Sequence, residues 1–300
     1  MSDSKRFLHP EAVQRISRLE LRARYIVEGF LSGMHRSPYF GQSIEFRQHR
    51  QYTPGDDLRH VDWKVWAKQD RYYVKQFEED TNLRCTLLVD VSESMQYGDG
   101  PLTKYDYAAT VAVSLAYLIL RQQDAVGCTS FDSAIRATVP LRTRQTHLRS
   151  IADSLAVSEP RSKTDLFQIL RGVAESHPRR GMIVLISDLL SDQQQLIKGL
   201  RMLRQQGHDV MVFHVMDDDE LDFPFTGPTR FEGLESSDNL NCNPRALRAG
   251  YMAALEHFLE EVRRGCAKNT VDYALIRTRD PLDAALAAYL SNRLGMHHRN

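Results

Sequence analysis

From Leu83 onward the chain alternates short, continuously apolar segments with longer amphipathic ones. The apolar segments include residues 83–91, 125–131, 181–189 and 209–216, which have the length of buried strands and are bounded by polar residues. Strands that are apolar on both faces must be covered on both sides, and the intervening helices supply that cover. The pattern therefore predicts an α/β domain with a doubly wound, mostly parallel sheet.

The other elements of this domain follow from the same periodicities. Helices are predicted at residues 103–122, 145–157, 164–177, 191–206, 245–267 and 281–294, and further strands at 135–141 and 271–278. Residues 217–235 show no regular period and contain Pro and Gly, which predicts an irregular segment. Its acidic start, Asp217–Glu220, is interpreted as a solvated loop, with a second cation site as the alternative.

The chain before Leu83 has a different character. Residues 10–33 have the spacing of one amphipathic helix, and residues 71–77 alternate like a strand. Between them, Pro54-Gly55 marks a turn. We therefore expect an N-terminal extension over residues 1–82 and the α/β domain over residues 83–300.

Composition narrows the possible functions. Lys and Arg number 39 and so do Asp and Glu, so the formal net charge of +0 argues against binding nucleic acid through bulk charge. No stretch of about 18 apolar residues predicts a membrane span, and the N-terminus lacks the apolar core of a signal peptide. The four cysteines form no CxxC pair, which predicts buried, inert thiols and a reduced, cytoplasmic protein.

Polar side chains follow the predicted strands where each strand ends. Asp90 lies at the end of the first apolar segment and is followed by Ser92 and Ser94, Asp188 lies at the end of the segment 181–189, and Thr164 opens a helix. Ligands of open α/β sheets bind outside the carboxyl ends of the strands, so these side chains are expected at one edge. Hydroxyl and carboxylate oxygens suit Mg²⁺ or Mn²⁺. The sequence therefore predicts a metal site whose ion keeps a position open for a carboxylate of another molecule.

These five residues resemble, in order and approximate spacing, the metal-ion-dependent adhesion site of von Willebrand factor A-type domains. The resemblance implies that Ser92, Ser94 and Thr164 hold the ion directly, while Asp90 and Asp188 act through water or orient the ligands.

A second resemblance covers most of the chain. The segment GQSIEFRQHRQYTPGDDLRHVDWKVWAKQDRYYVKQFEED, over residues 41–80, and ELDFPFTGPTRFEGLE, over residues 220–235, closely resemble the bacterial family called domain of unknown function 58. Members of that family look like partners of MoxR-type AAA+ ATPases. The resemblance implies a non-enzymatic adaptor or assembly role, in which the metal binds an Asp or Glu of the ATPase or of its client.

Other functions have weaker support in the sequence. A Mg²⁺-dependent hydrolase using Asp90 and Asp188 is the main alternative, but the hydroxyls that follow Asp90 supply no general base. Arg47, Arg59, Trp63 and Trp66 are candidates for a docking surface, with ordinary packing and ion pairing as the simpler interpretation.

Overall fold

The computed structural model describes residues 23, 27, 48–51, 73–76, 83–98, 102–157, 165–233, 239–282 and 287. The chain divides into two compact units, one made of residues 1–30 and 83–300 and the other of residues 31–82. The second unit contains an antiparallel pair of strands, β1 (Gln48–Gln51) and β2 (Tyr73–Gln76). Strand β2 lies within the strand predicted at 71–77.

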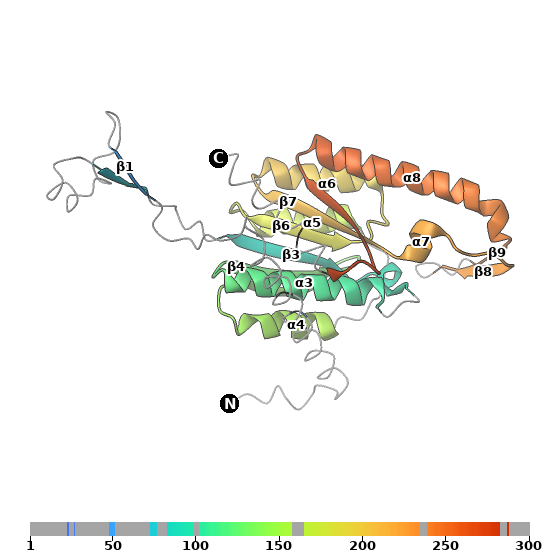
Figure 1. Ribbon diagram of the computed structural model, residues 1–300, viewed down its shortest axis with the longest axis horizontal. Coiled ribbons are helices and arrows are strands. Elements are labelled where there is room, and N and C mark those ends of the chain that lie inside the picture. The colour runs from blue at the N-terminus through green and yellow to red at the C-terminus, as the bar shows by residue number, and fades with distance from the viewer. Residues whose placement is uncertain are drawn as a thin grey trace, which may run out of the picture. The chain divides into compact units, whose positions relative to one another are not determined.

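The first unit is built on a six-stranded sheet with the order β10-β7-β6-β3-β4-β5 (Figure 1). Its strands are β3 (Arg84–Asp90), β4 (Ala125–Phe131), β5 (Ile135–Arg142), β6 (Met182–Ser187), β7 (Asp209–Met216) and β10 (Asp272–Arg277). All neighbours pair in parallel except β5, which is antiparallel to β4 and whose residues alternate between exposed and half-buried. The predicted α/β fold with a mostly parallel sheet is confirmed.

The chain starts the sheet in its middle and extends it in both directions. From β3 it runs outward to β4 and β5, then returns to β3's other side and continues through β6, β7 and β10. This doubly wound order places a topological switch point between β3 and β6, and ligands of such sheets bind outside the carboxyl ends of the strands there. Asp90 and Asp188 lie at the carboxyl ends of these two strands.

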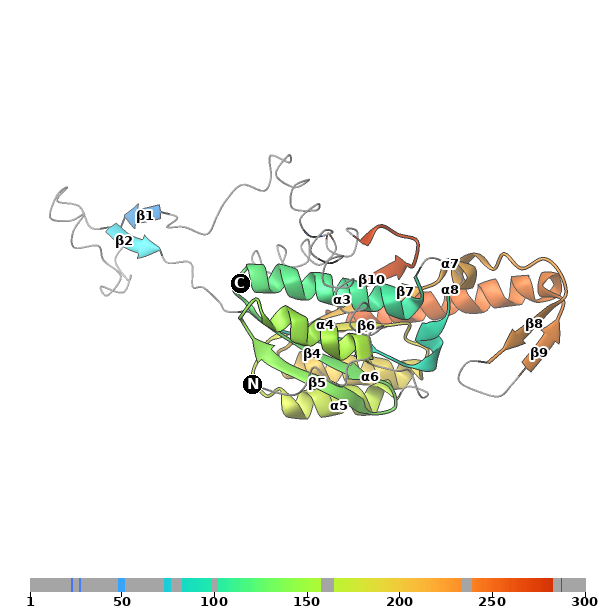
Figure 2. The same ribbon diagram turned by 90° about the horizontal axis from the view of Figure 1, so that it is seen from below.

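Among the described residues, five long helices cover the two faces of the sheet. Helices α3 (Lys104–Arg121) and α4 (His147–Val157) lie on one face, and α5 (Leu166–Ser176), α6 (Gln193–Gln205) and α8 (Pro244–Lys268) lie on the other (Figure 1). Each lies within about three residues of its predicted bounds. The amino-terminal part of α8 runs past the end of the sheet, as Figure 2 shows.

Close packing holds the layers together. Helix α3 is buried on nearly all sides, as its run of Ala, Val, Leu and Ile predicts. On the opposite face, Leu170 of α5 and Leu200 of α6 pack with Leu185 and Val212 of the sheet. At Gly199 an added Cβ would lie 2.7 Å from Leu170 Cδ1, so glycine is what allows α5 and α6 this close approach.

The segment from 217 onward is more ordered than its irregular sequence pattern predicts. It forms helix α7 (Asp218–Asp222) and a hairpin of β8 (Thr229–Glu232) and β9 (Asn239–Cys242). The interpretation of Asp217–Glu220 as a solvated loop is wrong, because Asp217 and Asp218 are only 5% and 6% exposed. Asp217 caps α7 and Glu220 closes a capping box with it, an arrangement that stabilises the start of a helix.

The remaining sequence expectations concern thiols, membranes and the chain termini. All four cysteines are free; Cys85, Cys128 and Cys266 are buried and Cys242 is half-buried. Burial raises the pKa of the Cys128 and Cys266 thiols to about 12, which makes these two thiols inert. Within the described ranges, no helix combines the length and apolar character that crossing a membrane requires. Ala23 and Val27 are helical and buried.

Several predictions fall on residues that the structure does not describe. These are the rest of the helix 10–33, most of the helix 281–294, and the candidate docking residues Arg47, Arg59, Trp63 and Trp66.

Candidate metal centre

The turn after β3 brings three of the predicted metal-site residues together. Strand β3 ends at Asp90, and a short 3₁₀ helix, η3 (Glu93–Gln96), begins directly after Ser92. The Ser92 amide donates to Asp90 Oδ1 at 2.9 Å, and the Ser92 and Ser94 hydroxyl oxygens lie 3.1 Å apart. All three residues are at most 6% exposed. The D-x-S-x-S pattern thus folds into one compact turn of buried oxygen atoms.

Strand β6 joins this turn through Ser187, a residue outside the predicted metal set. Its hydroxyl donates to Asp90 Oδ2 at 2.6 Å and accepts from the Leu189 amide at 2.9 Å. Leu189 has a φ of 56°, a left-handed conformation that is uncommon for a leucine and that turns the chain sharply after Asp188. Ser187 therefore ties the ends of β3 and β6 together at the switch point of the sheet.

Asp90 and Asp188 influence each other electrostatically. Burial, and then the negative charge of Asp188, raise the pKa of the Asp90 carboxyl to about 7, even though hydrogen bonds from Ser187 and Ser92 favour its ionised form. Ionising both carboxylates in this dry environment is unfavourable unless a positive charge is near. The pair is therefore suited to hold a cation.

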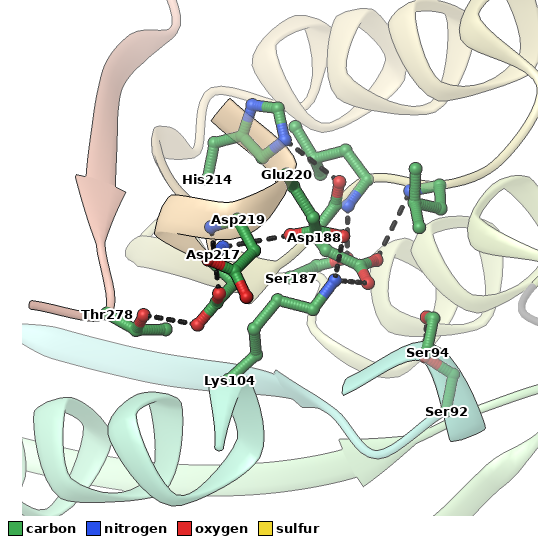
Figure 3. Close-up of polar contacts among 12 residues, drawn as sticks. Ser92, Ser94, Lys104, Ser187, Asp188, His214, Asp217, Asp219, Glu220 and Thr278 are labelled. Atoms are coloured by element: carbon green, nitrogen blue, oxygen red, sulfur yellow. Dashed lines mark hydrogen bonds and ion pairs between the residues drawn. The ribbon is translucent and has the colours of Figure 1, made fainter. Parts of the chain in front are cut away.

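One positive charge at this edge belongs to the protein itself. Lys104, at the start of α3, is fully buried, and its ammonium donates to Asp188 Oδ2 and to Glu220 Oε1, both at 2.8 Å (Figure 3). Burial alone would disfavour its charge, but the two carboxylates raise the pKa of Lys104 above its ordinary value. Lys104, Asp188 and Glu220 thus form a buried ionic cluster, which we call the Lys104 triad.

Two further contacts fix the Lys104 triad. Glu220 Oε2 accepts from the Asp217 amide at 2.8 Å, so the capping box of α7 holds this carboxylate in place. Behind Asp188, His214 Nε2 donates to the Asp188 carbonyl at 2.9 Å, and His214 Nδ1 accepts from the Tyr273 hydroxyl at 2.8 Å. Burial lowers the pKa of His214 to about 4, so this imidazole is neutral at pH 7 with one defined tautomer.

The structure places four of the five predicted metal-site residues. Asp90, Ser92 and Ser94 share one turn, and Asp188 lies on the adjacent strand end, close enough for its charge to act on Asp90. Thr164 lies outside the described residues, so its place in the set stays a prediction.

The donor atoms of this set fit a hard divalent cation. They are hydroxyl and carboxylate oxygens, the donor types that Mg²⁺ and Mn²⁺ prefer, and two of the carboxylates repel each other without a cation. Among the described residues, no group of three or more His, Cys, Asp and Glu side chains is arranged to hold a metal. A metal held here by the described residues would therefore use the hydroxyls of Ser92 and Ser94 as well as carboxylates.

The chain matches a protein-family model and two mycobacterial relatives over most of its length. Residues 48–260 match the family model described as "Protein of unknown function DUF58". An uncharacterized protein of Mycobacterium tuberculosis strain H37Rv and one of Mycobacterium bovis are each 30% identical to this chain over 268 residues, 86% of this chain and 83% of the relative.

Solved structures with similarity to this chain include two of interest. One is the conserved hypothetical protein BatB from Bacteroides thetaiotaomicron, with 15% identity and a TM-score of 0.44 over 70% of this chain and 98% of that chain. The other is the VWA domain of SpRpn10, with 14% identity and a TM-score of 0.41 over 69% of this chain and 94% of that one.

Proposed function

Because the chain belongs to the DUF58 family and has a von Willebrand factor A-like α/β fold, we propose that it is a non-enzymatic adaptor that binds another protein through a divalent cation. The observation that carries this proposal is the buried Asp90–Ser94 turn beside Asp188 at the switch point of the sheet. The family's description assigns it no function.

The residues of the centre have distinct roles in this proposal. Ser92, Ser94 and Thr164 would hold Mg²⁺ or Mn²⁺, with Asp90 and Asp188 acting through water or orienting the ligands. The bound ion would supply a positive charge with an open coordination position that a carboxylate can fill. Ser187 keeps Asp90 in place, and the burial of the turn limits the access of competing water.

The resemblance to the family implies the kind of partner. We infer that a MoxR-type AAA+ ATPase, or a client protein of such an ATPase, offers an Asp or Glu to the ion. Contact through one ion adds charge-directed specificity to an interface that otherwise depends on complementary shape. The chain would then act in assembly or maturation of other proteins rather than in catalysis.

Metal binding is expected to stabilise the wild type. A ligand at 100 times its Kd adds about 2.7 kcal/mol to the free energy of unfolding, so saturating Mg²⁺ or Mn²⁺ should raise the Tm by several degrees. Asp90→Ala and Ser92→Ala should show no such rise, whereas Ser176→Ala, whose serine lies at the far end of α5, should behave like the wild type. Equal shifts in all four proteins, measured by scanning calorimetry, would contradict the site.

Binding of the partner is expected to depend on the metal. In a pull-down with the MoxR-type ATPase, EDTA and Ser94→Ala should each reduce the captured ATPase at least about tenfold, the change that loss of one good polar contact produces. Retained capture in both conditions would mean that the partner is right but that no metal bridges the two proteins.

A hydrolase is the alternative function, and one observation favours it. A buried carboxyl with a pKa of about 7, as in Asp90, has the proton affinity of a general base or acid at neutral pH. Turnover of a generic phosphoester such as p-nitrophenyl phosphate in the presence of Mg²⁺, abolished by Asp90→Ala, would support hydrolysis. Absence of turnover with a correctly folded protein would leave the adaptor function.

A further inference from the structure

The site holds an internal cation beside the residues predicted to hold an external one. Lys104 is 0% exposed and Asp188 is 2% exposed, and the ammonium lies 2.8 Å from Asp188 Oδ2. Figure 3 shows the Lys104 side chain reaching from α3 toward Asp188 and Glu220, with Ser92 and Ser94 on the neighbouring turn. One of the two carboxylates at the switch point is therefore already paired with a positive charge.

We propose that Lys104 is a tethered cation that sets the metal affinity of this site by competing with the divalent ion for Asp188. This inference rests on the proposed function, because it concerns the same metal centre. In this arrangement Lys104 is an affinity-determining residue that itself touches no metal.

Two effects make Lys104 and the divalent ion compete for Asp188. An ammonium and a divalent cation that both approach Asp188 repel each other, and the repulsion is strong because the site is shielded from water. In addition, the Asp188 oxygens already accept hydrogen bonds from the Lys104 ammonium and the Leu190 amide, which leaves fewer lone pairs to orient a metal-bound water. Both effects weaken metal binding as long as Lys104 stays on Asp188.

Glu220 gives Lys104 a second place for its charge. This carboxylate is held by the Asp217 amide, and the Tyr251 hydroxyl donates to the Glu220 carbonyl at 2.8 Å, so Glu220 stays in place when Asp188 turns toward a metal. Lysine has a flexible stem and three donors, so its ammonium can keep the Glu220 contact while it releases Asp188. The triad thus has a metal-free arrangement with both ion pairs and a metal-bound arrangement with only one.

The test is a calorimetric titration of Mg²⁺ and Mn²⁺ into the wild type and into Lys104→Gln/Glu220→Gln. This double variant removes one positive and one negative charge, so its net charge is unchanged, and it leaves Asp188 free. We expect the double variant to bind both ions about 10- to 100-fold more tightly, the range in which groups behind metal ligands change affinity. Lys198→Gln/Glu175→Gln, a pair of exposed residues on α6 and α5, is the matched control and should bind like the wild type.

The possible results separate this inference from the proposed function. Equal affinity of the double variant and the wild type would overturn the role of Lys104 and leave the metal site standing. Absence of binding to both proteins would overturn the metal site itself and the inference with it.

A measurement on the wild type covers the case in which the double variant does not fold. In protein labelled with ¹⁵N at the lysine Nζ atoms, the buried Lys104 ammonium should give a signal with slow proton exchange. Saturation with Mg²⁺ should shift this signal, because the ammonium loses its Asp188 contact. An unchanged signal at saturation would overturn the inference.

Discussion

Lys104→Met is expected to lower the free energy of unfolding of the metal-free protein by about 3–5 kcal/mol, the usual cost of removing one partner from a buried ionic cluster. Methionine keeps most of the lysine stem, so packing at the start of α3 changes little. The loss comes from Asp188, which is buried, and from Glu220, which is half-buried, because both lose the ammonium that now lies 2.8 Å from each. Urea denaturation in EDTA measures the change.

Controls for this prediction use the same substitution and the same partners. Lys198→Met removes an exposed ammonium 4.7 Å from the Phe167 ring and should cost no more than about 1 kcal/mol. Adding Asp188→Asn to Lys104→Met should recover part of the loss, because the two residues share one interaction and their effects are not additive. A loss below about 1 kcal/mol for Lys104→Met would show that the triad does not stabilise the fold.

Asp90→Asn is expected to make the metal-free protein more stable at pH 8, by up to about 4 kcal/mol. The pKa of Asp90 is about 7 in the folded protein, against an ordinary value of 3.8. Folding therefore favours the protonated carboxyl. The stability that Asp90 contributes in this way is fully present below pH 3.8 and is lost as the pH rises through 7. Above pH 7 the wild type must bury an ionised Asp90, whereas asparagine stays neutral.

His214 produces the opposite slope and must be separated from Asp90. Burial lowers the pKa of His214 to about 4, so its contribution to stability grows as the pH rises from about 4 to its ordinary value of 6.5. Both the wild type and Asp90→Asn contain His214, so the contribution of His214 cancels in the difference between their unfolding free energies. The unfolding free energy of the wild type minus that of Asp90→Asn, measured in EDTA, should fall as the pH rises from 4 to 8. A difference that stays constant over this range would contradict the raised pKa of Asp90.

Local sequence patterns predicted the mostly parallel sheet, the helices that cover it, and the position of Asp188 and the Asp90–Ser94 turn in the metal centre. Strands β3, β4, β6 and β7 are apolar runs whose ends are marked by polar residues, so the position of Asp90 and Asp188 at one edge follows from the chain alone. The Asp90–Ser94 turn was also predictable, because its contacts are between residues two apart in sequence.

The Lys104 triad was not predictable in the same way. Its members are 84 and 116 residues apart, and in the sequence Lys104 is one charged residue at the start of an apolar helix, where exposure is the ordinary expectation. One signal was present: Asp217 and Glu220 have the spacing of a capping box, which predicts a helix start rather than a solvated loop. That Glu220 then reaches Lys104 depends on the tertiary fold.

The left-handed backbone at Leu189 bears on how quickly the centre can respond to a cation. The Leu189 side chain is fully buried in the core, and its amide is held by Ser187, so the main chain on either side of Asp188 is fixed by packing. Exchanging one cation for another at Asp188 then requires rotations about side-chain bonds and no rearrangement of the main chain beside it. Mg²⁺ gives up its bound water reluctantly, so dehydration of the incoming ion would limit the rate rather than movement of the main chain at Leu189.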